Sequence, residues 1–125
     1  MFQNLDIFRT AMAMARHAGT QQALSAQNIA NADTPGYRAR HLHAFEDTVR
    51  DAMVGQRATR SGHMNGSVDR NIQFIEERGA ADPNGNAVSL EEEMINAVGA
   101  KRQNDRALAI YRSNLNILRT SIGKR

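Results

Sequence analysis

The stretch that decides the fold of this 125-residue chain is Ser25-Ala26-Gln27-Asn28-Ile29-Ala30-Asn31-Ala32-Asp33-Thr34-Pro35-Gly36-Tyr37-Arg38. It is typical of a helix end that runs into a sharp turn. Pro35 restrains Thr34 to an extended conformation, and Pro35-Gly36 suits the central positions of a type II turn. Asn28 and Asn31 can bond to backbone groups that the ending helix leaves unpaired. On these grounds alone, an ordinary helix-stop loop explains the stretch as well as a functional site does.

Upstream of this turn, the chain has the periodicity of one long helix. Apolar or small residues recur at alternating spacings of three and four, which is the pattern of a coiled-coil seam. The predicted seam residues are Leu5, Phe8, Met12, Ala15, Gly19, Gln22, Ala26 and Ile29. Gly19 lowers helix stability by about 1 kcal/mol relative to Ala. We therefore expect another element to approach Gly19 closely.

The C-terminal end of the chain predicts a second long helix with the same alternation. Its seam residues are Leu90, Met94, Ala97, Lys101, Asn104, Leu108, Tyr111, Leu115, Leu118 and Ile122. Ser89, with Glu92 three residues later, has the capping-box pattern, and Gly123 suits a helix C-cap. Glutamates 91–93 crowd the first turn and basic residues end the chain, as the helix macrodipole favours.

Two polar residues, Lys101 and Asn104, interrupt the apolar seam of this second helix. A solvated stretch of helix surface explains them. Alternatively, they control the alignment of the helix with its partner, because a polar seam residue fixes register at some cost in stability.

The middle of the chain, from about Arg38 to Val88, is rich in Gly, Asn, His and Arg and lacks a long period. Residues 46–54 fit one short helix, and residues 72–75 fit either a short strand or simple packing. Asp82-Pro83-Asn84-Gly85-Asn86 is a strong turn signal, because Asn-Gly tolerates positive φ.

The sequence thus predicts a mainly α chain. Its long N- and C-terminal helices pair as a coiled-coil-like hairpin, and an irregular, loop-rich middle holds a short helix or strand. The predicted divisions are residues 1–37 for the N-terminal helix and its turn, 38–88 for the middle and 89–125 for the C-terminal helix. Pairing buries one face of each helix, so the remaining faces are available to neighbouring subunits.

Composition limits the classes of function. The chain has 41% hydrophobic and 5% aromatic residues and no Trp, which is lean for a compact core and favours dependence on partners. It has no Cys, so disulfides, thiolate zinc sites and a Cys nucleophile are excluded. The net charge of +3 is too small to indicate nucleic-acid binding by itself. No targeting segment is evident, so we expect a cytoplasmic chain or one exported without a cleavable signal.

Longer motifs add a resemblance to a family. Asn28-Ile29-Ala30-Asn31 followed by Thr34-Pro35-Gly36-Tyr37 resembles the N-terminal signature of the flagellar rod, hook and hook-filament axial proteins. Residues 84–94 resemble the start of the C-terminal helix of the proximal rod type, and residues 111–123 resemble its end. The resemblance covers roughly residues 5–50 and 82–125. The chain is therefore identified as a member of the flagellar basal body rod protein family, most like its proximal rod type.

This resemblance implies a structural subunit and not an enzyme. Family membership implies export through the flagellar type III apparatus without a cleaved signal, and assembly into an inner helical tube around the export channel. The implied partners are the chain itself, other rod proteins, the inner-membrane ring with its adaptor protein and the export apparatus. The implied assembly residues are Asn28, Ile29, Ala30, Asn31, Thr34, Pro35, Gly36 and Tyr37. Neither a cofactor nor a small-molecule substrate is expected.

Sites of other kinds are weak in this sequence. His41 and His43, with His17 and His63, lack the Cys or spaced carboxylates that a metal site needs. The glutamates at 91–93 fit a solvated helix start better than acid–base chemistry. No Walker loop, nucleophile elbow or dinucleotide fingerprint is present.

Nucleic-acid binding is the alternative from another class. The arginines that make the middle basic are Arg38, Arg40, Arg50, Arg57, Arg60 and Arg70. A nucleic-acid surface would interleave aromatic residues with such a stripe, and Phe45 and Phe74 do not do so. A solvated or channel-facing surface explains the arginines more simply, and we expect no nucleic-acid partner.

One short element has two interpretations. Phe45, with Val49 four residues later, resembles the element by which early rod and hook subunits are recognised at the export gate. Alternatively, both side chains lie on one face of a short helix and pack inward.

Overall fold

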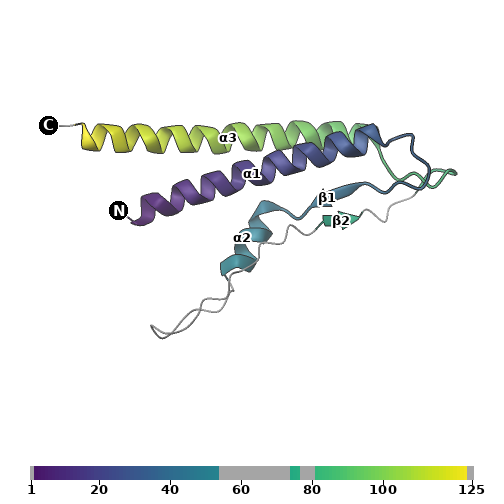
Figure 1. Ribbon diagram of the computed structural model, residues 1–125, viewed down its shortest axis with the longest axis horizontal. Coiled ribbons are helices and arrows are strands. Elements are labelled where there is room, and N and C mark those ends of the chain that lie inside the picture. The colour runs from purple at the N-terminus through teal and green to yellow at the C-terminus, as the bar shows by residue number, and fades with distance from the viewer. Residues whose placement is uncertain (1, 54–73, 77–80, 124–125) are drawn as a thin grey trace.

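A computed structural model describes residues 2–53, 74–76 and 81–123 of the chain. Two long helices dominate it: α1 (Phe2–Ala30) and α3 (Leu90–Ile122). They lie side by side and antiparallel, so that both chain ends lie at the same end of the molecule (Figure 1). The shorter elements are β1 (Arg40–Leu42), α2 (Phe45–Met53) and β2 (Phe74–Glu76).

The predicted fold class is confirmed: the chain is mainly α, and its terminal helices pair around a loop-rich middle. The short helix predicted at residues 46–54 is α2. The strand option for residues 72–75 is realised by β2, which pairs antiparallel with β1, Arg40 opposite Glu76 and Leu42 opposite Phe74. Residues 54, 72 and 73 lie outside the described part of the chain, and β1 was not predicted.

The contact between α1 and α3 is built from small side chains. The buried residues in its central part are Ala11, Ala18, Ala100 and Ala107. On each helix these alanines are one heptad apart, so they repeat along a single line that faces the partner. Small residues let two helices approach closely, but each contributes little apolar area, and burial of area is what stabilises the pair.

One of the two lines of the predicted seam needs a correction of one residue. On α1 the buried line runs through Ala11, Ala18 and Ser25, each one position before a predicted seam residue. On α3 it runs through Glu93, Ala100 and Ala107, again one position earlier. The prediction followed the large apolar side chains. The closely packed helices instead bury their smallest side chains, which lie one position earlier.

The correction separates the predicted seam residues into two groups. Half-buried in the structure are Phe8, Ala15, Ile29, Ala97, Asn104, Tyr111, Leu115 and Leu118. Exposed are Met12, Gly19, Gln22, Ala26, Leu90, Met94, Lys101, Leu108 and Ile122. The side chain of Leu5 lies outside the described part of the chain. The exposed group therefore lies at or beyond the margin of the intrachain contact.

Gly19 contradicts a second expectation. A Cβ built on Gly19 would meet nothing within 4 Å among the described residues, so no described element approaches it closely. The glycine lies on the exposed side of α1, and its backbone freedom is not required by any described intrachain contact.

The helix ends of α3 follow local sequence signals. The Ser89 hydroxyl accepts a hydrogen bond from the backbone N–H of Glu92 at 3.4 Å, as an N-cap does. At the other end the N–H of Gly123 donates to the carbonyl of Arg119 at 2.8 Å. Both predicted caps are confirmed, although Gly123 has a φ of −80° and ends the helix in a right-handed conformation.

None of the described helices combines the length and apolar character needed to cross a membrane.

Candidate functional site

The turn that follows α1 has the geometry expected from Pro35-Gly36. The N–H of Tyr37 donates to the carbonyl of Thr34 at 3.2 Å, and Gly36 has a φ of +72°. Asn31 supports the turn from both sides, because its amide donates to Gln27 O at 2.8 Å and its side-chain oxygen accepts from the Thr34 hydroxyl at 3.2 Å. We call residues 28–37 the signature turn.

A second turn, which we call the docking turn (residues 82–88), packs against the first and leads into α3. It is closed by the N–H of Gly85, which donates to Asp82 O at 2.7 Å, and Gly85 has a φ of +80°. Two backbone hydrogen bonds join the two turns: Gly36 N–H to Asn84 O at 3.2 Å, and Ala87 N–H to Tyr37 O at 3.0 Å. The backbones are so close that a Cβ on Gly85 would lie 3.4 Å from the Cα of Gly36.

Asn86 is the side chain that fastens the docking turn to the signature turn. It is 2% exposed, and its amide nitrogen donates to Asn31 O at 3.0 Å and to Thr34 O at 2.7 Å. Its side-chain oxygen accepts from the N–H of Val88 at 2.9 Å. Every polar atom of this buried amide therefore has a partner, as buried amides require.

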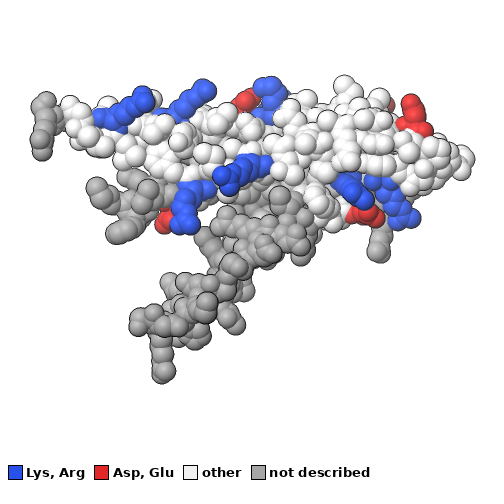
Figure 2. Space-filling view, in the orientation of Figure 1, with Lys and Arg blue, Asp and Glu red and all other residues white. Residues whose placement is uncertain are grey.

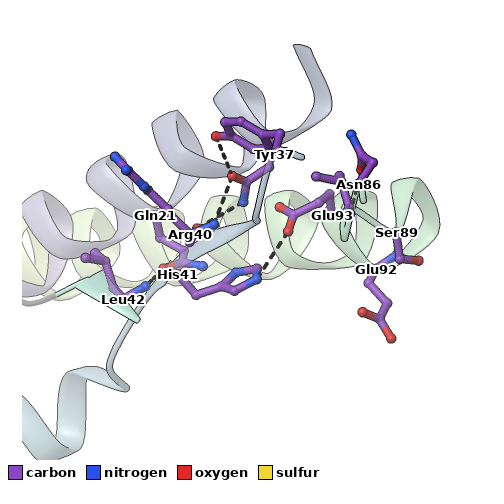
Figure 3. A network of polar contacts seen from close by, with 11 residues as sticks. Gln21, Tyr37, Arg40, His41, Leu42, Asn86, Ser89, Glu92 and Glu93 are labelled. Atoms are coloured by element: carbon purple, nitrogen blue, oxygen red, sulfur yellow. Dashed lines mark hydrogen bonds and ion pairs between the residues drawn. The ribbon is translucent and has the colours of Figure 1, made fainter. Parts of the chain in front are cut away.

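Asn28 has the corresponding role for the segment after the signature turn. This fully buried residue donates to Arg40 O at 2.9 Å. Its side-chain oxygen accepts from Arg40 N–H at 3.1 Å and from the Tyr37 hydroxyl at 3.2 Å. Tyr37 and Arg40, both labelled in Figure 3, therefore bond to the same side-chain amide. The amide thus joins the last turn of α1 to the start of β1.

Two further side chains of α1 continue this attachment along the helix. The side-chain oxygen of Gln21 accepts from Leu42 N–H at 3.2 Å. His17 Nε2 lies 2.8 Å from His43 O, and because a carbonyl only accepts, the His17 proton is assigned to Nε2. One edge of the extended segment is therefore held by α1 side chains, while β2 pairs with the segment at β1.

A buried carboxylate joins β1 to the start of α3. Glu93 is 1% exposed, and its Oε1 lies 3.4 Å from His41 Nε2 (Figure 3). Glu93 is in the first turns of α3, where the helix dipole favours negative charge. The three segments α1, β1 and α3 thus meet at one polar cluster.

The junction contains interlocked amides and backbone groups. Among the described residues, no group of three or more His, Cys, Asp or Glu side chains is arranged to hold a metal ion. His63 lies outside the described part of the chain. What the arrangement does physically is fix the direction in which the chain leaves α1 and enters α3.

The sequence is similar to a known protein over most of its length. No family model matches the chain. Over 118 residues it is 30% identical to the flagellar basal body rod protein FlgB of Agrobacterium fabrum strain C58, and the match covers 89% of this chain and 88% of the relative. The chain belongs to the FlgB family of flagellar basal body rod proteins.

In this FlgB-family chain, the structure brings most of the predicted assembly residues together. Asn28, Asn31, Thr34, Gly36 and Tyr37 all take part in the junction through side-chain or backbone hydrogen bonds. The remaining predicted residues are Ile29, which is half-buried, and Ala30 and Pro35, which are exposed.

Four residues that form the junction in this chain were not among the predicted sites: Gln21, His41, Asn86 and Glu93. The sequence did signal a turn at residues 82–86, but a turn motif does not reveal the surface on which it docks. Gln21 was not singled out in the sequence, and Glu93 was assigned to a solvated helix start because polar residues on a helix are usually solvated.

Phe45 and Val49 both lie on α2 and are half-buried. The Phe45 ring packs near His17 of α1, with ring centroids 5.5 Å apart. This contact attaches α2 to α1, and a role of Phe45 in export stays a prediction.

Proposed function

We propose that this chain is a structural subunit of the proximal rod of the bacterial flagellum and is required for motility. Its paired terminal helices assemble into the axial tube that surrounds the export channel and transmits torque. The observation that carries the proposal is the pairing of α1 with α3 through small residues, with large apolar residues left exposed. Membership of the FlgB family supplies the context in which such a surface is used.

The exposed apolar residues of α3 support assembly with other subunits. Large apolar side chains left at least half exposed on this helix are Leu90, Met94, Ile95, Val98, Ile117 and Ile122. Contiguous exposed apolar surface on a soluble chain marks interaction sites. Four of these residues lie within the first three turns of α3, directly after the docking turn.

The proposed partners are the chain itself, other rod proteins, the inner-membrane ring with its adaptor protein and the type III export apparatus. The proposed place is the periplasm-spanning rod of the basal body, reached without a cleaved signal peptide. In this proposal residues 1–37 and 89–125 supply the tube helices, residues 38–88 form the segment between them, and neither nucleic acid nor a small-molecule substrate is bound.

The described charges do not favour nucleic-acid binding. On the face in Figure 2, Lys and Arg are spread along the molecule, and several of them lie beside Asp or Glu. Arg40 lies 3.4 Å from Glu76, which partly neutralises it. The side chains of Arg50, Arg57, Arg60 and Arg70 lie outside the described part of the chain. Salt-dependent DNA binding with a steep slope would support the alternative.

Imaging and deletion together test the proposal. We expect cells that lack the chain to be non-motile, and cryo-electron microscopy of isolated basal bodies to locate the labelled chain in the proximal rod. Normal swimming of the deletion strain, or a label elsewhere in the basal body, would contradict the proposal.

A matched pair of variants tests the exposed surface. Val98→Glu places a charge on the exposed apolar residues of α3, whereas Ser113→Glu places the same charge at an exposed polar position of the same helix. We expect both chains to keep their helices, and only Val98→Glu to block assembly. Equal assembly of the two variants would remove Val98 from the subunit interface.

A further inference from the structure

We propose that the signature turn is an intramolecular dock for the start of α3, and that Asn86 is the positioning residue that completes it. The turn then acts within one subunit and is not itself a contact between subunits. The effect that we expect on rod assembly rests on the proposed function, whereas the docking of the two turns within one chain does not.

The backbone groups of the signature turn are already used inside the chain. The carbonyl oxygens of Asn31 and Thr34 accept from Asn86 at 3.0 and 2.7 Å. The N–H of Gly36 and the carbonyl of Tyr37 are bonded to the docking turn at 3.2 and 3.0 Å. A neighbouring subunit that used these four groups would have to displace the docking turn first.

The amide of Asn86 suits this position better than the other polar side chains of similar size. Both donated bonds cross from the docking turn to the signature turn, and the side chain is 2% exposed. An aspartate has the same shape but no donor when it is ionised. At this position its carboxylate would face two carbonyl oxygens and would lose solvation without gaining a partner.

The docking of Asn86 sets the direction of α3 relative to α1. Val88, whose N–H donates to the Asn86 side chain at 2.9 Å, directly precedes the N-cap Ser89 of α3. Asn86 therefore holds the last residues before the helix against the end of α1. Without that attachment α3 would still form from its own caps and periodicity, but its direction relative to α1 would not be fixed.

The turn offers a matched control at Asn84. Asn84 is exposed, and its side chain only accepts, from the N–H of Asn86 at 3.0 Å. Asn84→Asp keeps that acceptor oxygen, and Asn86→Asp removes both donors. The two variants add the same charge to the same turn, so a difference between them reports what is specific to position 86, which is the loss of two donors and the burial of the carboxylate.

Amide hydrogen exchange on the full-length purified chain tests the docking. In Asn86→Asp we expect the amides of Gly36 and Ala87 to exchange about ten- to a hundredfold faster than in the wild type, because two cross-turn bonds are lost. In Asn84→Asp we expect rates close to the wild type. Equal rates in the two variants would overturn the proposal.

A measurement on the wild-type chain keeps the test independent of variant folding. Gly36 and Ala87 belong to opposite turns, so docking predicts that both amides open together and exchange with one common protection. Protection factors that differ by more than about tenfold would show separate opening and would overturn the dock.

A motility assay distinguishes the docking within one chain from its expected effect on rod assembly. We expect Asn86→Asp and the uncharged Asn86→Ala to be secreted but not to support swimming, and Asn84→Asp to swim. Faster exchange together with normal swimming would overturn the assembly consequence and leave the dock intact. Failure of the proposed function would instead be seen as swimming without the chain.

Discussion

Asn104 of α3 donates its side-chain amide to the backbone carbonyl of Ala15 on α1 at 3.2 Å. One heptad away on both helices, Phe8 and Tyr111 meet edge to face with ring centroids 5.1 Å apart. The fully buried side chains next to these contacts are alanines, which fit several alignments about equally well. Lys101 differs from Asn104, because it is exposed and pairs with Asp105 of its own helix at 2.9 Å.

We predict that Asn104→Ala weakens the specific alignment of α1 and α3. The expected loss of unfolding free energy is about 0.5–1.5 kcal/mol, the net contribution of one hydrogen bond. The chain has no Cys, so introduced pairs report alignment cleanly. Ala11→Cys with Ala107→Cys should crosslink faster than Ala18→Cys with Ala107→Cys, which is one heptad out of register. Asn104→Ala should reduce that ratio.

The control for Asn104 is Asn114→Ala. Asn114 is half-buried on the same helix, but its amide donates to Ile110 O of α3 itself at 3.0 Å. We expect its crosslinking ratio to match the wild type. An unchanged ratio in Asn104→Ala would show that the hydrogen bond to Ala15 does not fix the register.

We predict that Gly36→Val blocks rod assembly while secretion continues. Gly36 has a φ of +72°, which a β-branched residue adopts only at a cost of about 1–3 kcal/mol. A Cβ at this position meets no described residue within 4 Å, so the cost comes from the backbone and not from a clash. Gly36→Asn is the control, because Asn tolerates positive φ. Normal swimming with Gly36→Val would reduce the signature turn to a helix stop.

We predict that Gly19→Ala raises the unfolding free energy of the chain by about 1 kcal/mol, because alanine favours helix and the space is open. Urea unfolding measures the change. Gly99→Ala is the matched control on α3, where a Cβ also meets nothing within 4 Å. Destabilisation by Gly19→Ala would contradict the geometry of α1. Impaired swimming in Gly19→Ala alone would place a neighbouring subunit against this glycine.

We predict that Phe45→Ala reduces secretion more than it reduces stability. The ring is half-buried, so its removal should cost about 1 kcal/mol, well below the cost for a fully buried Phe. The control is His17→Ala, which removes the ring that packs on Phe45 but leaves Phe45 in place. Normal secretion of Phe45→Ala, scored apart from subunit stability, would remove the export role.

We predict that the free chain opens at both helix ends in dilute solution. Isolated helices are marginal in water, and the alanine contact between α1 and α3 buries little area. Hydrogen exchange should show lower protection at the distal ends of both helices than at Arg40 and Ala87 in the junction. Full protection of residues 8–30 in a monomer would contradict the prediction, because it would show that α1 is stable without neighbouring subunits.

Local signals predicted the parts of the fold that depend on near neighbours in sequence. The turn at residues 34–37 follows from Pro35-Gly36, and the start of α3 follows from Ser89. Each of these features forms its deciding contact within four residues, as between Ser89 and Glu92. The chemistry of adjacent residues was therefore sufficient.

The remaining features depend on surfaces that meet across long separations. Asn86 bonds to Asn31 from 55 residues away, and β1 was missed because its partners are side chains of α1 and the strand β2. One line of the predicted seam was placed one residue too late, because the apolar pattern does not show how closely the two helices approach each other. Close packing of alanines left larger residues such as Met94 exposed.

The sequence alone therefore determined that this chain forms two long terminal helices, where α1 ends and where α3 begins, because caps and turns act over one helical turn. Tertiary structure alone decided which face of each helix is buried, and that the two turns bind each other through Asn86. Those outcomes depend on the relative positions of α1, β1 and α3, since an amide such as Asn86 can be buried only where the carbonyls of another segment accept its protons.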